Sequence, residues 1–263
     1  MMCSLKMVSP RPPTTLFQSN GDGFPTFLPK EVKDIKDPFA RALAQKIVRI
    51  PVPLQMENFR GCVMSSCIKP TVQLPDKSPV VLLHCFDSSC LEWRRAYPLL
   101  EEACLETWAI DVLGWGFSDL QKLPPCDAAS KRHHLFEVKL LKSFPLRLLA
   151  NVLAFSSPLS ENIDWTNIGR LHCQMPWWED AMVNFMISGG YNVASHIKLI
   201  NHKTLVICSE NDQIVSNQLS VKLLCELQNA VFREVPDSGH LPHVENPKQF
   251  VKLISDFASG KLN

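Results

Sequence analysis

Short apolar runs alternate along this chain with segments whose apolar residues recur every three or four positions. Val80–Leu83 is a continuous apolar run, typical of a strand buried on both faces. Residues 91–103 carry apolar side chains at helical spacing, interrupted at Pro98, and Thr107–Val112 is a second apolar run. A strand, a helix and a strand within about 40 residues predict one βαβ unit with parallel strands.

The segments before this unit predict a helix and a pair of strands. Val32–Val48 has apolar residues at four-residue steps, which predicts a helix. Arg49–Gln55 and Cys62–Ile68 lie on either side of a polar turn, so we expect two antiparallel strands.

Two further strands are expected near the C-terminus. Lys203–Cys208 and Val231–Val235 are apolar runs, and the stretch between them has leucines at helical spacing. Asn246 and Pro247 are suited to cap and open a final helix, because proline is favoured at the first helical position.

Residues 138–192 have a different pattern, without the alternation expected of strands. Leucine and phenylalanine recur there at helical spacing, and three of the six tryptophans of the chain, Trp165, Trp177 and Trp178, lie in this stretch. We expect a helical subdomain whose apolar side chains either form its own core or line a ligand pocket. A shorter helix is predicted over Ala128–Glu137.

Composition excludes several classes of protein and site. The net charge of +1 gives no indication of a basic surface that binds nucleic acid. No apolar run approaches the ~20 residues that span a bilayer. The ten cysteines form no C-x-x-C pair, and His133 and His134 have no metal partner at helical spacing. The sequence therefore predicts reduced cysteines, no metal site and no cofactor.

Five stretches of the chain are similar to α/β-hydrolases, and in particular to plant members associated with plastids. They are SSCLEW, AIDVLGWGFSD, DWTNIGRLHC, PWWEDA and SGHLPHVE. The resemblance runs from about Leu28 to the C-terminus and implies an α/β-hydrolase fold, a mostly parallel sheet flanked by helices and covered by a helical cap. It divides the chain into a disordered tail or transit peptide (1–27), the first half of the core (28–137), the cap (138–192) and the second half of the core (193–263).

The resemblance also assigns candidate site residues. Asp212, after one strand, matches the acid of the family, and His240, after the next strand, matches its base. The matching oxyanion donor is the backbone N–H of Phe86. Two positions depart from the family, since Cys85 and Ser209 stand where glycine is usual, and a Cβ at Cys85 is expected to crowd the oxyanion hole or change its backbone.

The nucleophile of the family is absent from this sequence. No G-x-S-x-G motif occurs anywhere in the chain, and Glu137 leads directly into Val138, where the family has a strand, the elbow, its helix and another strand. Such a unit takes ~30 residues or more, so a whole strand–helix–strand segment is missing. We therefore predict an α/β-hydrolase core without its central nucleophile unit.

Two functional interpretations arise from this loss. In the first, the chain descends from serine hydrolases that act on esters or similar carbonyl compounds, and it is inactive as written. In the second, it is a non-catalytic protein of the same fold that binds a small apolar ligand or a protein partner. The resemblance and the acid-poor segment Met1–Gly21 favour a chloroplast location over the cytoplasm, and oligomeric state is not determined by the sequence.

The missing unit leads to a prediction about the sheet. In the resembling fold the missing strands lie between Val80–His84 and Lys203–Cys208. Buried strand edges are costly when unpaired, so we expect Lys203–Cys208 to pair in parallel with Val80–His84.

Overall fold

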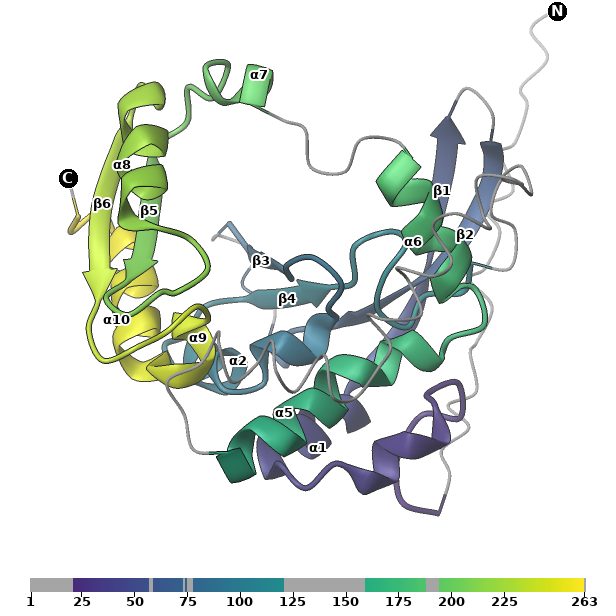
Figure 1. The fold of residues 1–263 in the computed structure, drawn as a ribbon. Coiled ribbons are helices and arrows are strands. Elements are labelled where there is room, and N and C mark those ends of the chain that lie inside the picture. The colour runs from purple at the N-terminus through teal and green to yellow at the C-terminus, as the bar shows by residue number, and fades with distance from the viewer. Residues whose placement is uncertain are drawn as a thin grey trace, which may run out of the picture.

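The computed structural model describes residues 21–56, 59–72, 74, 78–120, 159–187 and 194–262 (Figure 1). Its strands form one four-stranded and one two-stranded sheet, and helices pack around them. This mixed arrangement of sheets and flanking helices is the α/β architecture that the sequence predicts.

The four-stranded sheet contains the predicted βαβ unit. Strands β1 (Ile47–Met56) and β2 (Phe59–Ile68) form an antiparallel hairpin, and β4 (Thr107–Ile110) pairs antiparallel with β2 and parallel with β3 (Val80–Leu83). The resulting order is β1-β2-β4-β3, which leaves β3 at the edge. The predicted strand positions are confirmed, although both hairpin strands extend further than the apolar pattern indicated.

The prediction that β3 is buried on both faces is wrong. Leu82 is buried, but Val81 is 50% exposed and Leu83 is 59% exposed. In the strand order β3 comes last, beside β4, so the opposite edge of the strand is unpaired among the described residues. One face and one edge of an apolar strand are therefore open.

The predicted helix over Val32–Val48 is wrong as a single element. The structure has a 3₁₀-helix η1 (Lys30–Asp34) and a separate helix α1 (Pro38–Gln45), and β1 begins at Ile47. The break occurs because Pro38 starts α1 and the Asp37 carboxylate caps it, accepting from Phe39 N at 2.8 Å. Asp37 also holds the buried Arg94 guanidinium, with Nε 3.2 Å from Oδ2.

The predicted helix between β3 and β4 likewise consists of two elements. A 3₁₀-helix η2 (Cys90–Trp93), capped by the Ser89 hydroxyl, precedes helix α2 (Ala96–Glu102). Pro98 does not break a helix, because it lies in the first turn of α2, where its missing N–H costs no hydrogen bond.

The described part of the 138–192 stretch is helical, as predicted. It contains α5 (Leu159–Leu171), the 3₁₀-helix η3 (His172–Gln174) and α6 (Trp178–Ile187). Trp165, Trp177 and Trp178 are buried and belong to the main hydrophobic core. The predicted helix over Ala128–Glu137, with His133 and His134, lies outside the described residues, and so do the tail over 1–20 and the first part of the cap.

The second sheet is a parallel pair, β5 (Thr204–Ser209) and β6 (Ala230–Val235). Helix α7 (Ala194–Ile197) precedes it, α8 (Asn217–Glu226) connects its strands, and α9 (Pro242–Glu245) and α10 (Pro247–Ala258) come after it. Asn246 caps α10, and Phe250, Val251 and Leu253 are its buried residues. These elements confirm the predicted C-terminal strands and final helix.

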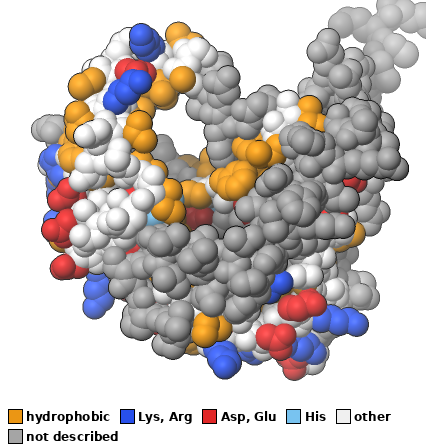
Figure 2. All heavy atoms as spheres, viewed as in Figure 1, with side chains coloured by type: hydrophobic (Ala, Val, Ile, Leu, Met, Phe, Trp, Pro, Cys, Tyr) orange, Lys and Arg blue, Asp and Glu red, His pale blue; other side chains and the backbone are white. Residues whose placement is uncertain are grey.

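The predicted pairing of β5 with β3 is wrong. Among the described residues β3 pairs with β4 alone, and β5 pairs with β6 alone. Figure 1 shows the two sheets standing apart, and Figure 2 shows the same face hollowed between them, with hydrophobic side chains along the lower rim of the hollow. The reason lies in the helices, because α10 packs on α2 and α9 packs on η2, and these contacts fix the position of the second sheet independently of the β3 edge.

No described helix is long and apolar enough to cross a bilayer.

Candidate functional site

The two candidate acid–base residues lie together at the end of the second sheet. Asp212 comes after β5 and His240 after β6, and because the strands are parallel, both loops lie at the carboxyl end of the sheet. The His240 ring contacts the Asp212 carboxylate through Nδ1, which lies 3.0 Å from Oδ2 and 3.2 Å from Oδ1. This is the arrangement in which a carboxylate orients an imidazole for proton transfer at its other nitrogen.

The loop after β5 stabilises the charge of Asp212. Its Oδ1 accepts hydrogen bonds from the backbone N–H groups of Ile214, at 2.8 Å, and Val215, at 2.9 Å. Burial by itself raises the pKa of Asp212, but these N–H groups and His240 outweigh burial and hold the pKa below its usual value. Asp212 is therefore ionised at neutral pH.

The candidate oxyanion loop comes directly after β3, on the other sheet. Phe86 is 41% exposed, and its backbone N–H donates no hydrogen bond within the described part of the chain. Cys85 does not adopt positive φ, so its backbone conformation does not require glycine; the positive-φ residue of this loop is Asp87, at 48°. The Cys85 side chain is exposed at the surface.

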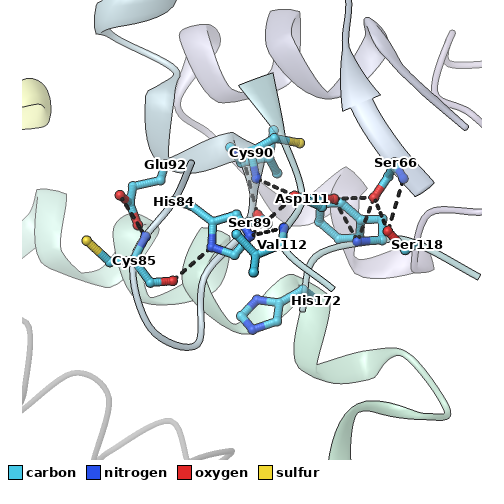
Figure 3. Close-up of polar contacts among 12 residues, drawn as sticks. Ser66, His84, Cys85, Ser89, Cys90, Glu92, Asp111, Val112, Ser118 and His172 are labelled. Carbon is cyan, nitrogen blue, oxygen red and sulfur yellow. Dashed lines mark hydrogen bonds and ion pairs between the residues drawn. The ribbon is translucent and has the colours of Figure 1, made fainter. Parts of the chain in front are cut away.

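A buried polar network lies beside this loop (Figure 3). Asp111, at the end of β4, accepts from the backbone N–H groups of Cys90, at 2.6 Å, and Phe117, at 2.8 Å, and also from the Ser66 hydroxyl. The His84 ring accepts from Val112 N at 3.0 Å and contacts the Cys85 carbonyl through Nδ1 at 2.8 Å. The loop after β3 is thus tied to the loop after β4.

Glu92 connects the oxyanion loop with the histidine loop. Its two carboxylate oxygens lie 3.3 and 3.2 Å from the backbone N of Cys85, and Oε1 lies 3.3 Å from Nε2 of His243. The His243 ring also stacks on Trp93, with centroids 4.4 Å apart. His243 comes three residues after His240, so one buried carboxylate links the two halves of the candidate site.

Three aromatic side chains lie together next to the backbone N–H of Phe86. Phe86 contacts Trp115 and Phe185 at centroid distances of 5.4 and 5.7 Å, and these two rings lie 4.8 Å from each other. Trp115 comes from the loop after β4 and Phe185 from α6, so the predicted cap segment contributes directly to the apolar surface beside the loop.

Sequence reasoning missed the residues that connect these parts. Glu92 and His243 stand within the SSCLEW and SGHLPHVE stretches, but neither spacing nor periodicity marks them as partners. No serine or cysteine hydrogen-bonds to the His240 ring among the described residues; Asp212 is its hydrogen-bonding partner there. Ser209 is buried, and its hydroxyl has no partner in the described structure.

Comparison with known proteins gives a relative that matches over the full length of this chain. The chain is 71% identical to the alpha/beta hydrolase domain-containing protein VTE7 of Arabidopsis thaliana, over all of both chains. That alignment spans 329 positions and this chain has 263 residues, so about 66 positions have no counterpart here. No family model matches the sequence.

Solved structures share the fold at low sequence identity. A membrane phospholipase A described as a bacterial virulence factor is 14% identical, with a TM-score of 0.60, and the match covers 87% of this chain and 89% of that one. A thermophilic esterase from Thermogutta terrifontis is 12% identical, with a TM-score of 0.61, and the match covers 82% of this chain and 99% of the esterase.

Proposed function

The chain belongs to the α/β-hydrolase family, and from that premise we propose that it is a serine-hydrolase descendant that no longer performs covalent ester hydrolysis. Asp212 is its acid, His240 its base and the Phe86 N–H its oxyanion donor. The nucleophile that these groups serve in an active hydrolase is missing. Esterase- and lipase-like neighbours support an ester or a similar carbonyl compound as the ancestral substrate class.

The geometry of His240 carries this proposal. The ring is oriented through Nδ1 by a carboxylate, as a general base is. Its other nitrogen makes no hydrogen bond to a serine or cysteine among the described residues, and the sequence contains no G-x-S-x-G elbow to bring one there. The alignment surplus of about 66 positions is long enough for the missing strand–helix–strand unit and supports its loss.

A fluorophosphonate probe and p-nitrophenyl esters test the proposal directly. We expect no labelling of the purified protein, and no ester turnover above the rate in a His240→Ala variant, because no activated serine is present. Labelling that disappears in the His240→Ala variant would show that a nucleophile does lie beside the base.

The aromatic surface favours the second function, binding of a small apolar ester-like molecule without turnover. Phe86 is 41% exposed and packs on the half-buried Phe185 and the buried Trp115, next to a backbone N–H that donates to no described group. Such a surface with one polar donor suits a ligand with a carbonyl group. Quenching of tryptophan fluorescence by a non-hydrolysable ester analogue is expected, and a Phe185→Ala variant is expected to weaken it. Equal quenching in both proteins would contradict this assignment.

We propose a chloroplast location from the acid-poor segment Met1–Gly21. A fluorescent protein fused behind residues 1–27 should enter plastids, and a fusion lacking these residues should remain outside. Cytoplasmic fluorescence from the first fusion would contradict the location.

A further inference from the structure

A cluster of three potential metal ligands lies away from the acid–base pair. Asp87 comes after β3, and His172 and Cys173 belong to η3, so two segments that are 85 residues apart in sequence meet there. All three residues are buried, and their ligand atoms lie within 4.8 Å of one another. Figure 3 shows the His172 ring beside the loop that carries His84 and Cys85.

Two potential ligand groups meet at one nitrogen of the His172 ring. Its Nε2 lies 2.9 Å from Asp87 Oδ1 and also 3.7 Å from Cys173 Sγ. The other ring nitrogen, Nδ1, is buried without a hydrogen-bonding partner in the described structure. Here two groups converge on one nitrogen, as ligands do around a common ion.

The distances and the charges suit a divalent transition metal. Zinc bonds of ~2.0–2.3 Å separate tetrahedral ligand atoms by about 3.3–3.8 Å. The N–S distance lies in that range, and the N–O distance is shorter by a few tenths of an ångström. A thiolate and a carboxylate together neutralise a divalent cation, which removes the cost of burying an isolated charge. Sulfur, imidazole and carboxylate ligands together favour zinc or cobalt over magnesium or calcium.

A neighbouring side chain holds the carboxylate in place. Trp178 Nε1 donates to Asp87 Oδ1 at 2.9 Å and so restricts the orientation of the carboxylate. Groups of this kind orient ligands in metal sites. We propose that Asp87, His172 and Cys173 form a zinc site that joins the loop after β3 to the helical segment, with the fourth coordination position left for water or another ligand.

Because the ligands are buried, the metal is expected to enter during synthesis and folding. The full chain is therefore produced in zinc-supplemented medium, purified without chelators and assayed for metal by mass spectrometry. About one zinc per chain is expected. Protein produced in cobalt-supplemented medium should show a thiolate-to-cobalt charge-transfer band together with the visible absorption of tetrahedral cobalt.

Two conservative variants and one matched control separate this site from adventitious binding. Cys173→Ser and Asp87→Asn preserve side-chain shape, and each is expected to lower zinc affinity at least ~10-fold. Cys173→Ser, which removes the sulfur ligand, is also expected to abolish the cobalt–thiolate band. Cys67→Ser also alters a buried free cysteine, but one that lies on β2, and it should retain both signals. Far-ultraviolet circular dichroism checks that each variant is folded.

Three results would overturn the site. The first is protein without bound zinc or a cobalt–thiolate band. The second is bound metal that Cys173→Ser and Asp87→Asn leave unchanged. The third is an equal loss of metal in the Cys67→Ser control.

Discussion

The two sheets of this protein are stabilised in different ways. The four-stranded sheet lies over a continuous hydrophobic core and has a buried polar network around Asp111 at the end of β4. The two-stranded sheet buries Val206, Cys208 and Ser209 on β5 and Val235 on β6, whereas the connecting helix α8 has no buried residue. The helices that follow the second sheet, α9 and α10, connect it to η2 and α2 of the first part of the chain.

Helices α8 and α10 show where that connection occurs. Every residue of α8 is at least partly exposed, and Leu219 and Val221 face solvent. In contrast, α10 buries Phe250, Val251 and Leu253 and packs on α2. An amphipathic helix normally covers a sheet or a neighbouring helix with its apolar side. Leu219 and Val221 lie two residues apart and so point to different sides of α8, and both are exposed.

This difference shows why removing central strands need not close a sheet. A free edge gains by pairing, but the second sheet is held by buried contacts between α9, α10 and the η2–α2 region. Moving β5 to β3 would break these contacts, including the Trp93–His243 stack and the Glu92–His243 pair. The two loops of the candidate site therefore stay attached to each other through Glu92 while their strands remain apart.

The largest expected effect comes from the junction between the two sheets, that is, the contacts of η2 and α2 with α9 and α10. Trp93 is buried against His243 and Phe250, with centroids 4.4 and 6.2 Å away. Trp93→Ala should cost about 3–5 kcal/mol of unfolding free energy, because it leaves a large cavity. Hydrogen exchange should then show α9 and α10 losing protection before the four-stranded sheet. Trp93→Phe, which keeps an aromatic ring, is the control. Equal loss of protection in the four-stranded sheet and in α9 and α10 would contradict the prediction that these helices separate first.

A second change tests the polar network of the four-stranded sheet. Gly116 has φ +71°, and a Cβ there would overlap the Asp111 carboxylate carbon. Gly116→Ala should cost about 2–4 kcal/mol, from backbone strain and displaced Asp111 hydrogen bonds. Gly114→Ala is the matched control, because it shares a positive φ but its Cβ meets Ala181 at an ordinary 3.7 Å. It should cost only the strain, about 1–2 kcal/mol, as measured by urea unfolding.

Acid should weaken the junction through Glu92. Burial by itself raises the pKa of Glu92, but the contact with His243 and its charge outweigh burial and bring that pKa to about 2, below the ordinary 4.5. Since the folded-state pKa is the lower one, ionised Glu92 stabilises the fold above pH 4.5, and this contribution is lost as the pH falls towards 2. The urea concentration at the midpoint of unfolding should therefore fall as the pH is lowered from 4.5 towards 2.

Glu92→Gln should reduce that acid dependence and cost about 1–3 kcal/mol at neutral pH. The exposed Glu102→Gln is the control and should leave the pH profile unchanged. If the stability of wild type and Glu92→Gln depended on pH in the same way, Glu92 would not be the cause of the acid sensitivity.

Local patterns in the sequence predicted the strands, the C-terminal helices and the α/β class. They failed where capping by Asp37 separates α1 from η1 and where the Ser89-capped η2 precedes α2, because capping depends on single side chains rather than on periodicity. The resemblance selected Asp212 and His240, and the structure brings them into contact. Their catalytic role remains a prediction, as do the domain boundaries.

Contacts between distant segments were beyond sequence reasoning. Glu92 meets His243, and Asp87 meets His172, across separations that no spacing rule covers. The expectation of no metal site rested on local ligand spacing, which cannot detect ligands that the fold assembles from separate segments. The failed prediction for β3 and β5 has the same origin, because helix packing fixes their separation.

The smallest expected effect concerns the exposed face of α8. Leu219 is 57% exposed, so Leu219→Gln removes little buried surface, and the unfolding free energy should change by no more than ~0.5 kcal/mol. The same substitution on α10, Leu253→Gln, should cost at least about 2 kcal/mol, because that side chain is buried and the amide would lack a partner. Urea unfolding of both variants gives the comparison. A large loss from Leu219→Gln would mean that α8 is covered in solution, so that the second sheet has support beyond α9 and α10.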